Sequence, residues 1–201
     1  MVDVMAVAAR AAAAAAAARD VPGLVQGLRS NRASEQAMAA AQLVNMCHHL
    51  PASKAAVLAA GGALVQLLHS RDNNVLGAAC AALAVLALCD PPSQAAIAAA
   101  GGIPLLTSLL LHSSDADVVA GAACALGRLT LQHTINAAAV VATECIPRLL
   151  QLLRDSSGAD LQKQVILLLM SLVATLGSCA ADIVAGGGIP LLVQRLQSSE
   201  L

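Results

Sequence analysis

Thiols, imidazoles and carboxylates are the side chains of this sequence that could carry out chemistry. The tripeptide Cys47-His48-His49 offers metal ligands, and Cys47 with His133 offers a nucleophile and a base. Neighbouring residues on a helix point about 100° apart, so the three side chains of the tripeptide do not converge on one ion. No third residue is placed to orient a Cys–His pair, as nucleophilic catalysis requires. The sequence therefore predicts no metal site, no cofactor and no enzymatic activity.

The remaining polar and glycine-rich motifs have structural interpretations. Asp115 and Asp117 precede an apolar run, where a carboxylate accepts hydrogen bonds from the free N–H groups of a helix start. The glycine clusters match neither the GxxxxGK(S/T) phosphate loop nor the GxSxG nucleophile turn. No predicted strand precedes them, as a dinucleotide-binding fold requires. These motifs therefore indicate helix ends and turns.

Composition narrows the class of protein further. The chain has 201 residues, a formal net charge of −1, 11% charged residues, and no Phe, Tyr or Trp. Nucleic-acid binding depends on a basic stripe and, for single strands, on aromatic stacking, so we expect no nucleic-acid partner. The six cysteines form no CxxC pair and lie mostly in apolar runs, where Cys behaves as a small apolar residue. We expect a reducing compartment and a cytoplasmic location, with a nuclear or ciliary one also compatible.

Two segments raise the question of membranes and targeting. Residues 165–181 form a charge-free run of 17 residues, at the short limit of a membrane span. The run contains Ser171 and Thr175 and falls in register with the repeats described below, so we expect a buried helix and no membrane span. Residues 1–19 are an alanine tract with Arg10 and Arg19, which predicts an Ala-rich helix or lead-in. An organelle transit peptide is the alternative, although the tract lacks serine and contains an aspartate.

An internal repeat organises the rest of the chain. The stretch AGGIPLLTSLL at 100–110 reappears as AGGGIPLLVQRL at 185–196, and in degraded form at 60–68 and 144–153. Self-similarity at such a period is the signature of stacked helical units. Successive copies start 42, 40, 43 and 43 residues apart, at Asp20, Gly62, Gly102, Cys145 and Gly188. We therefore divide the chain into units 20–61, 62–101, 102–144 and 145–187 and a partial unit 188–201.

Each unit has the same internal order of helices and turns. A short helix begins near a proline, which suits the first helical turn, in every full unit except 62–101, which lacks the proline. A polar connector then leads to a longer apolar helix. The long helices carry equivalent leucines, Leu43, Leu83, Leu126 and Leu169. A β-branched residue follows at a constant interval, as Val57, Ile97, Val140 and Ile183. Between units, pairs such as Gly101-Gly102 and Gly187-Gly188 are expected to end one helix in the left-handed conformation that glycine tolerates.

This pattern resembles the armadillo repeat family. The resemblance rests on the period, on the joint sequence G-G-I-P-x-L, and on the A-L-x-x-L core in CALGRL (124–129) and AALAVL (81–86). It covers residues 20–201, and the glycine joint favours it over HEAT repeats. It implies an all-α, right-handed α-solenoid, or superhelix, of three-helix units, about four full units plus a partial fifth. In that family the third helices line a concave groove that binds extended peptides or partner domains.

The resemblance also implies which residues would line this groove. An asparagine on the third helix of peptide-binding members grips the ligand backbone, and its amide matches a peptide unit. Only Asn45 keeps that residue here, and the tryptophans of nuclear import receptors are absent, which argues against import-signal binding. The candidate groove residues, which include the equivalents one helical turn further on, are Gln42, Asn45, His49, Val85, Cys89, Arg128, Gln132, Ser171 and Thr175. The intervening positions Ala41, Ala81, Cys124 and Leu167 predict a partly apolar surface.

These observations predict a non-catalytic protein–protein interaction scaffold that binds a partner peptide or helix. Two alternatives remain compatible with the sequence. The chain could be the substrate-recruiting fragment of a larger enzyme, such as a U-box/armadillo ubiquitin ligase, or a structural subunit of a ciliary or cytoskeletal assembly. The partial fifth unit is either a cap or part of a longer array, because a solenoid needs a capping element with a polar outer face.

Overall fold

The computed structural model describes residues 20–49, 60–88, 90–156 and 158–198, and the statements below concern these residues. They form helices and turns without a strand, which confirms the all-α prediction. After a helix over 20–28, the elements are α2 (Ala33–His49), α4 (Gly61–Leu67), α5 (Asn73–Ala87), α6 (Pro91–Ala99), α7 (Gly102–His112), α8 (Ala116–Thr130), α9 (Thr134–Val141), α10 (Ile146–Asp155), α11 (Ala159–Thr175), the 3₁₀ helix η2 (Gly177–Cys179), α12 (Ala180–Ala185) and α13 (Gly188–Ser198). The predicted Ala-rich helix at 1–19 lies outside the described residues.

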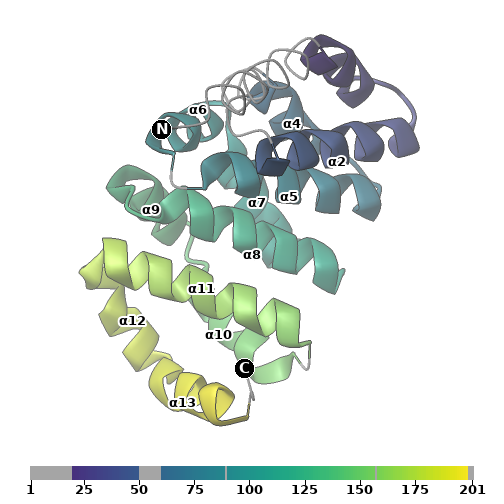
Figure 1. The fold of residues 1–201 in the computed structure, drawn as a ribbon. Coiled ribbons are helices and arrows are strands. Elements are labelled where there is room, and N and C mark those ends of the chain that lie inside the picture. Colours follow the sequence, from purple (N-terminus) through teal and green to yellow (C-terminus); the bar gives the residue numbers. More distant parts are fainter. Residues whose placement is uncertain (1–19, 50–59, 89, 157, 199–201) are drawn as a thin grey trace, which may run out of the picture.

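The helices recur in sets of three. A short helix, a helix of 10 or 11 residues and a long helix of 15 or 17 residues follow one another in α6–α7–α8 and again in α9–α10–α11. The four long helices α2, α5, α8 and α11 pack against one another in sequence order, one below the next (Figure 1). The long helices α5, α8 and α11 also pack against the helix that precedes each of them, α4, α7 and α10. The molecule is thus a stack in which a unit contacts mainly its neighbours, as in solenoid proteins.

The repeated apolar positions form the core between these layers. Leu43, Leu83, Leu126 and Leu169 are all buried. Ile97, Val140 and Ile183 are buried at equivalent places, and the fourth member of that series, Val57, lies outside the described residues. The aligned sequence positions therefore occupy equivalent environments. Because no aromatic residue is present, this core is made of small and medium aliphatic side chains in many contacts.

Glycine joints turn the chain between sets. Gly101 and Gly187 have φ of 84° and 75°, which confirms the predicted left-handed helix ends at these two places. A Cβ on the next residue, Gly102, would lie 2.9 Å from the carbonyl oxygen of Ile97, so the chain also needs glycine there for close packing. The pair at 61–62 differs, since both residues lie in the first turn of α4 and neither has a positive φ. That joint lacks the proline and belongs to the shorter, 40-residue repeat.

Glu144 occupies the position of Gly101 and Gly187 with φ of 54°. A left-handed conformation costs a residue with a Cβ about 1–2 kcal/mol, and glycine avoids this cost while losing some entropy on folding. We expect Glu144→Gly to raise the free energy of unfolding by about 0.5–1 kcal/mol, as measured by urea denaturation. Gly101→Ala should lower it by a similar amount. A destabilising effect of Glu144→Gly would show that this joint is not strained.

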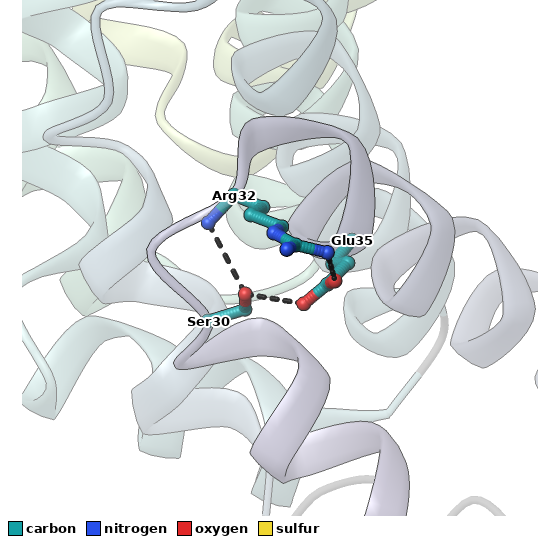
Figure 2. A network of polar contacts seen from close by, with 3 residues as sticks. All are labelled: Ser30, Arg32 and Glu35. Atoms are coloured by element: carbon teal, nitrogen blue, oxygen red, sulfur yellow. Dashed lines mark hydrogen bonds and ion pairs between the residues drawn. The ribbon is translucent and has the colours of Figure 1, made fainter.

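Polar connectors start the long helices. Asp115 accepts hydrogen bonds from the backbone N–H groups of Asp117 and Val118, which confirms its predicted capping role, and Asp72 does the same for α5. In the connector before α2, Ser30 and Arg32 both donate to the Glu35 carboxylate (Figure 2). The ion pair between Arg32 and Glu35 is exposed, so its contribution to stability is small.

The charge-free run at 165–181 does not form one continuous helix. α11 ends at Thr175, and Leu176 adopts an extended conformation before η2. Within the described ranges, no single helix is both long and apolar enough to cross a membrane. Two pairs of consecutive helices reach that length and apolar composition only when the two helices are taken together. The chain bends by 76° in one pair and by 88° in the other.

Candidate functional site

One side of the four long helices carries the candidate positions. Equivalent residues fall on the same side because the helices are related by the repeat. Asn45 is exposed on α2, and Val85 and Arg128 are half-buried on α5 and α8. We call this surface the long-helix face and define it by Ala41, Asn45, Ala81, Val85, Cys124, Arg128 and Leu167. Apart from Asn45 and Arg128, these residues are apolar or weakly polar, so the face offers a mainly apolar contact surface.

A hollow of about 290 Å³ opens on this face between α8 and α11. α8 contributes Cys124 and Arg128 to its lining, and α11 contributes Leu167, Met170 and Ser171. Arg128 is the one charged side chain in the lining. The hollow therefore suits an apolar side chain of a ligand whose adjacent group is a carbonyl or carboxylate, because the guanidinium donates hydrogen bonds to both.

The hydroxyl groups of Ser171 and Thr175 bond within the protein. Ser171 is 6% exposed; its Oγ lies 3.0 Å from the Gly127 carbonyl oxygen, to which it donates, and 2.9 Å from Thr130 Oγ1. Thr175 Oγ1 donates to the Thr130 carbonyl oxygen over 3.1 Å and accepts from the Gln132 N–H over 3.2 Å. A buried hydroxyl requires such partners. Unlike the exposed groove residue that was expected, Ser171 faces α8 and holds the two long helices together at the base of the hollow.

Apart from Val85 on α5, the candidate residues whose side chains are described fall into two separate groups. Arg128, Gln132, Ser171 and Thr175 lie together at the junction of α8 and α11. Gln42 and Asn45 are exposed on α2, which is separated from α8 by α5. Cys89 lies outside the described residues, as does the side chain of His49. A ligand that contacts both groups would have to extend from α2 across α5 to α8.

Two buried amides that the sequence analysis did not select support the α8 side of the hollow. Gln94 Nε2 donates to the carbonyl oxygens of Arg128 and Leu131, over 2.8 and 3.2 Å. Asn136 Nδ2 donates to the carbonyl oxygen of Leu129 over 2.9 Å. The last carbonyls of a helix have no partner within it, so these amides cap α8 from the neighbouring short helices. The sequence signal was an amide residue within each short, mostly apolar helix, three positions before Ile97 or four before Val140.

Cys80, which lies behind this surface, is buried and has a structural role. Burial raises the pKa of the Cys80 thiol to about 12, and the nearby Cys124 adds to the effect. Cys80 therefore stays protonated and packs as a small apolar side chain behind the face. Within the part of the chain that the structure describes, no three His, Cys, Asp or Glu residues are grouped so that they could hold a metal ion.

Stacked three-helix units with an exposed side of long helices define this molecule as an α-solenoid. The Armadillo/beta-catenin-like repeat family model matches residues 90–131, which contain α6, α7 and α8. The family's repeat thus begins with the short helix before the glycine joint, whereas the units defined from the sequence begin at the joint.

Solved structures extend the similarity to most of the chain. The crystal structure of an engineered protein is 31% identical, with a TM-score of 0.82 over 90% of this chain and 73% of that one. A designed armadillo repeat protein in complex with the peptide (KR)4 shares the fold at 20% identity, with a TM-score of 0.78 over 90% of this chain and 76% of that one. Computationally designed armadillo repeat proteins for modular peptide recognition are 21% identical, with a TM-score of 0.72 over 89% and 74%. No curated protein matches the chain. The chain belongs to the armadillo repeat family.

Proposed function

We propose that this protein is a non-catalytic scaffold that binds an extended segment or a helix of a partner protein along the long-helix face. The observation that carries the proposal is the hollow between α8 and α11, which is apolar apart from Gln164, Ser171 and the cation Arg128. Protein-binding surfaces combine such apolar anchor sites with a few oriented polar groups. Designed members of the family that recognise peptides support a peptide or helix as the ligand.

The charge of the hollow favours a particular ligand composition. One of the designed relatives is complexed with a basic (KR)4 peptide. In the present protein, the charged lining residue of the hollow is itself basic, so a Lys- or Arg-rich segment would be repelled there. We therefore propose a ligand with an aliphatic side chain for the hollow and an acidic residue next to it.

Affinity purification with the tagged full chain, followed by identification of the bound proteins, tests this function. For a partner captured in this way, we expect Arg128→Glu to weaken binding by about tenfold or more, because it places a carboxylate opposite the ligand's acidic group. Leu167→Asp, on the opposite wall of the hollow, should do the same, and Asn45→Ala tests whether the ligand reaches α2. Binding would be measured by titration calorimetry.

The matched control is Ile135→Lys. Ile135 is 78% exposed on α9 and does not line the hollow, so its substitution adds a charge while leaving the long-helix face intact. If every partner binds Arg128→Glu and Leu167→Asp as tightly as the wild type, with all variants folded, the long-helix face is not the binding surface.

We also propose a reducing compartment, and with it the cytoplasmic location expected from the sequence. Cys80, Cys124, Cys145 and Cys179 are free thiols, which supports this environment. Fluorescence microscopy of the tagged full chain in its native cell tests the location, and a signal confined to a secretory compartment would contradict it.

A further inference from the structure

A cavity of about 510 Å³ lies where the short helix α12 packs against α10. Val141 and Leu150 give it apolar walls, and its charged lining residues are Glu144, Arg154 and Asp182. We call this cavity the joint pocket and define it by these five residues. It shares no lining residue with the hollow between α8 and α11, so it is a separate site. Its volume is in the range of pockets that enclose a ligand group.

The charges of the joint pocket are specific to this joint. One repeat earlier, the residues at the three charged positions are Gly101, Leu111 and Ala139. The charged side chains of the joint pocket are exposed, and across the described ranges the structure has no ion pair between Arg154 and either carboxylate. Two carboxylates and one guanidinium give the joint pocket a formal charge of −1, so it attracts a cation.

The joint pocket lies on a side of the stack that a following unit leaves open. At the preceding joint, Pro104 and Ala139 are exposed although α10, α11, α12 and α13 all follow it. Pro147 and Asp182 occupy the same two positions one repeat later, and they are exposed as well. A further repeat after α13 would therefore leave the joint pocket accessible to a ligand.

The contact between α12 and α10 forms the floor of the joint pocket. A Cβ on Gly186 would collide with Cδ1 of Leu150, so glycine lets α12 approach α10 closely. Leu150 is buried, and Asp182 stands one helical turn before Gly186 on the same side of α12. A carboxylate thus lies at the edge of an apolar floor.

A basic side chain has the chemistry that this arrangement binds. Its methylene stem covers apolar surface, while its charged end stays at the rim and bonds to carboxylates. A metal ion would leave the apolar walls unused, and an acidic group would be repelled by the net charge. We propose that the joint pocket binds a lysine or arginine side chain in an extended segment of a partner protein. The stem would pack on Val141 and Leu150, and the charged group would pair with Glu144 and Asp182.

Titration of the isotope-labelled full chain with Nα-acetyl-lysine amide tests the proposal by nuclear magnetic resonance. We expect the backbone amide signals of Val141, Glu144 and Gly186 to shift with increasing concentration, and the signal of Leu167 in the hollow to stay in place. Nα-acetyl-norleucine amide is the matched ligand control, because it has an aliphatic stem without the ammonium group. It should bind about fivefold more weakly or less.

The variants separate the two carboxylates from the guanidinium. Glu144→Gly and Asp182→Asn should each weaken binding of the lysine amide about two- to fivefold, the range of an exposed ion pair. Because Glu144→Gly is expected to stabilise the protein, its weaker binding could not be attributed to unfolding. Arg154→Leu removes a like charge and should strengthen binding about twofold. Asp117→Asn removes a carboxylate that does not line the joint pocket, and it should leave binding unchanged.

The proposal is wrong if the norleucine amide binds as tightly as the lysine amide, because the charges would then contribute nothing. It is also wrong if the lysine amide shifts none of the three signals, or if Asp117→Asn weakens binding as much as Glu144→Gly and Asp182→Asn. Shifts confined to Leu167 would place the cation in the hollow. That result would contradict both the joint pocket and the acidic ligand proposed for the hollow, whereas the other results bear on the joint pocket alone.

Discussion

A loss of about 3–4 kcal/mol in the free energy of unfolding is the expected result of Leu126→Ala. Leu126 has no exposed surface and lies on α8, which packs against α5 on one side and α11 on the other. Removing three heavy atoms there loses their transfer free energy and leaves a cavity that the rigid helix stack closes only in part. The core has no aromatic side chain that could move into the space. Urea denaturation followed by circular dichroism at 222 nm would measure the effect.

The position of Leu126 in the stack also predicts which helices lose stability first. In a solenoid each unit is stabilised mainly by its neighbours, so hydrogen exchange should become faster in α5, α8 and α11 first. Ile135→Ala, which removes a 78% exposed side chain on α9, should change the stability by no more than about 0.5 kcal/mol. Equal effects of the two substitutions would contradict the assignment of Leu126 to the common core.

The architecture could be predicted from the sequence because the same pattern of buried and exposed positions occurs in each repeat. A single leucine carries little information, but Leu43, Leu83, Leu126 and Leu169 at equivalent positions indicate one buried layer. The joints are also predictable where glycine is required, as the left-handed Gly101 and Gly187 show. The left-handed conformation at Glu144 could not be predicted, because a residue other than glycine gives no sequence signal for a positive φ.

The candidate site could be predicted only in outline. The register places Arg128 and Leu167 on one side of the long helices, and the structure finds both in the hollow. The register does not tell how close two helices approach, and Ser171 lies where α11 touches α8, so its hydroxyl is used internally. Gln94 and Asn136 were missed for a related reason. Their partners are carbonyls 34 and 7 residues away, which a repeat pattern does not reveal.

Departures from the repeat carry the functional information in such a chain. Where two units share a residue type, as at Ile103, Ile146 and Ile189, a difference in exposure shows which of these positions another described unit covers. Where the residue type changes, as from Val85 to Arg128 along the long-helix face, the change alters what the surface attracts. The first kind of departure concerns the packing between units, and the second supports the proposed acidic ligand.

Gln94→Ala should lower the free energy of unfolding by about 2–3 kcal/mol, although it removes a polar side chain from an apolar core. Gln94 is buried and its amide donates to the carbonyl oxygens of Arg128 and Leu131, at the C-terminal end of α8. Alanine has the higher helix propensity, so a purely local view predicts a slight gain in stability. Two carbonyls that lose their partner in a buried place outweigh that gain, since each unsatisfied group costs about 1–3 kcal/mol.

The same substitution connects the core to the proposed binding surface. Gln94 donates a hydrogen bond to the backbone carbonyl of Arg128, whose side chain lines the hollow. Loss of this hydrogen bond should make the end of α8 less ordered and thereby weaken partner binding. Gln66→Ala on α4 is the matched control, because Gln66 is exposed and its loss should leave both properties unchanged. Denaturation and calorimetric titration of the two variants separate the effects. A Gln94→Ala protein as stable as the wild type would mean that water replaces the amide at the end of α8, and the hollow would then keep its affinity.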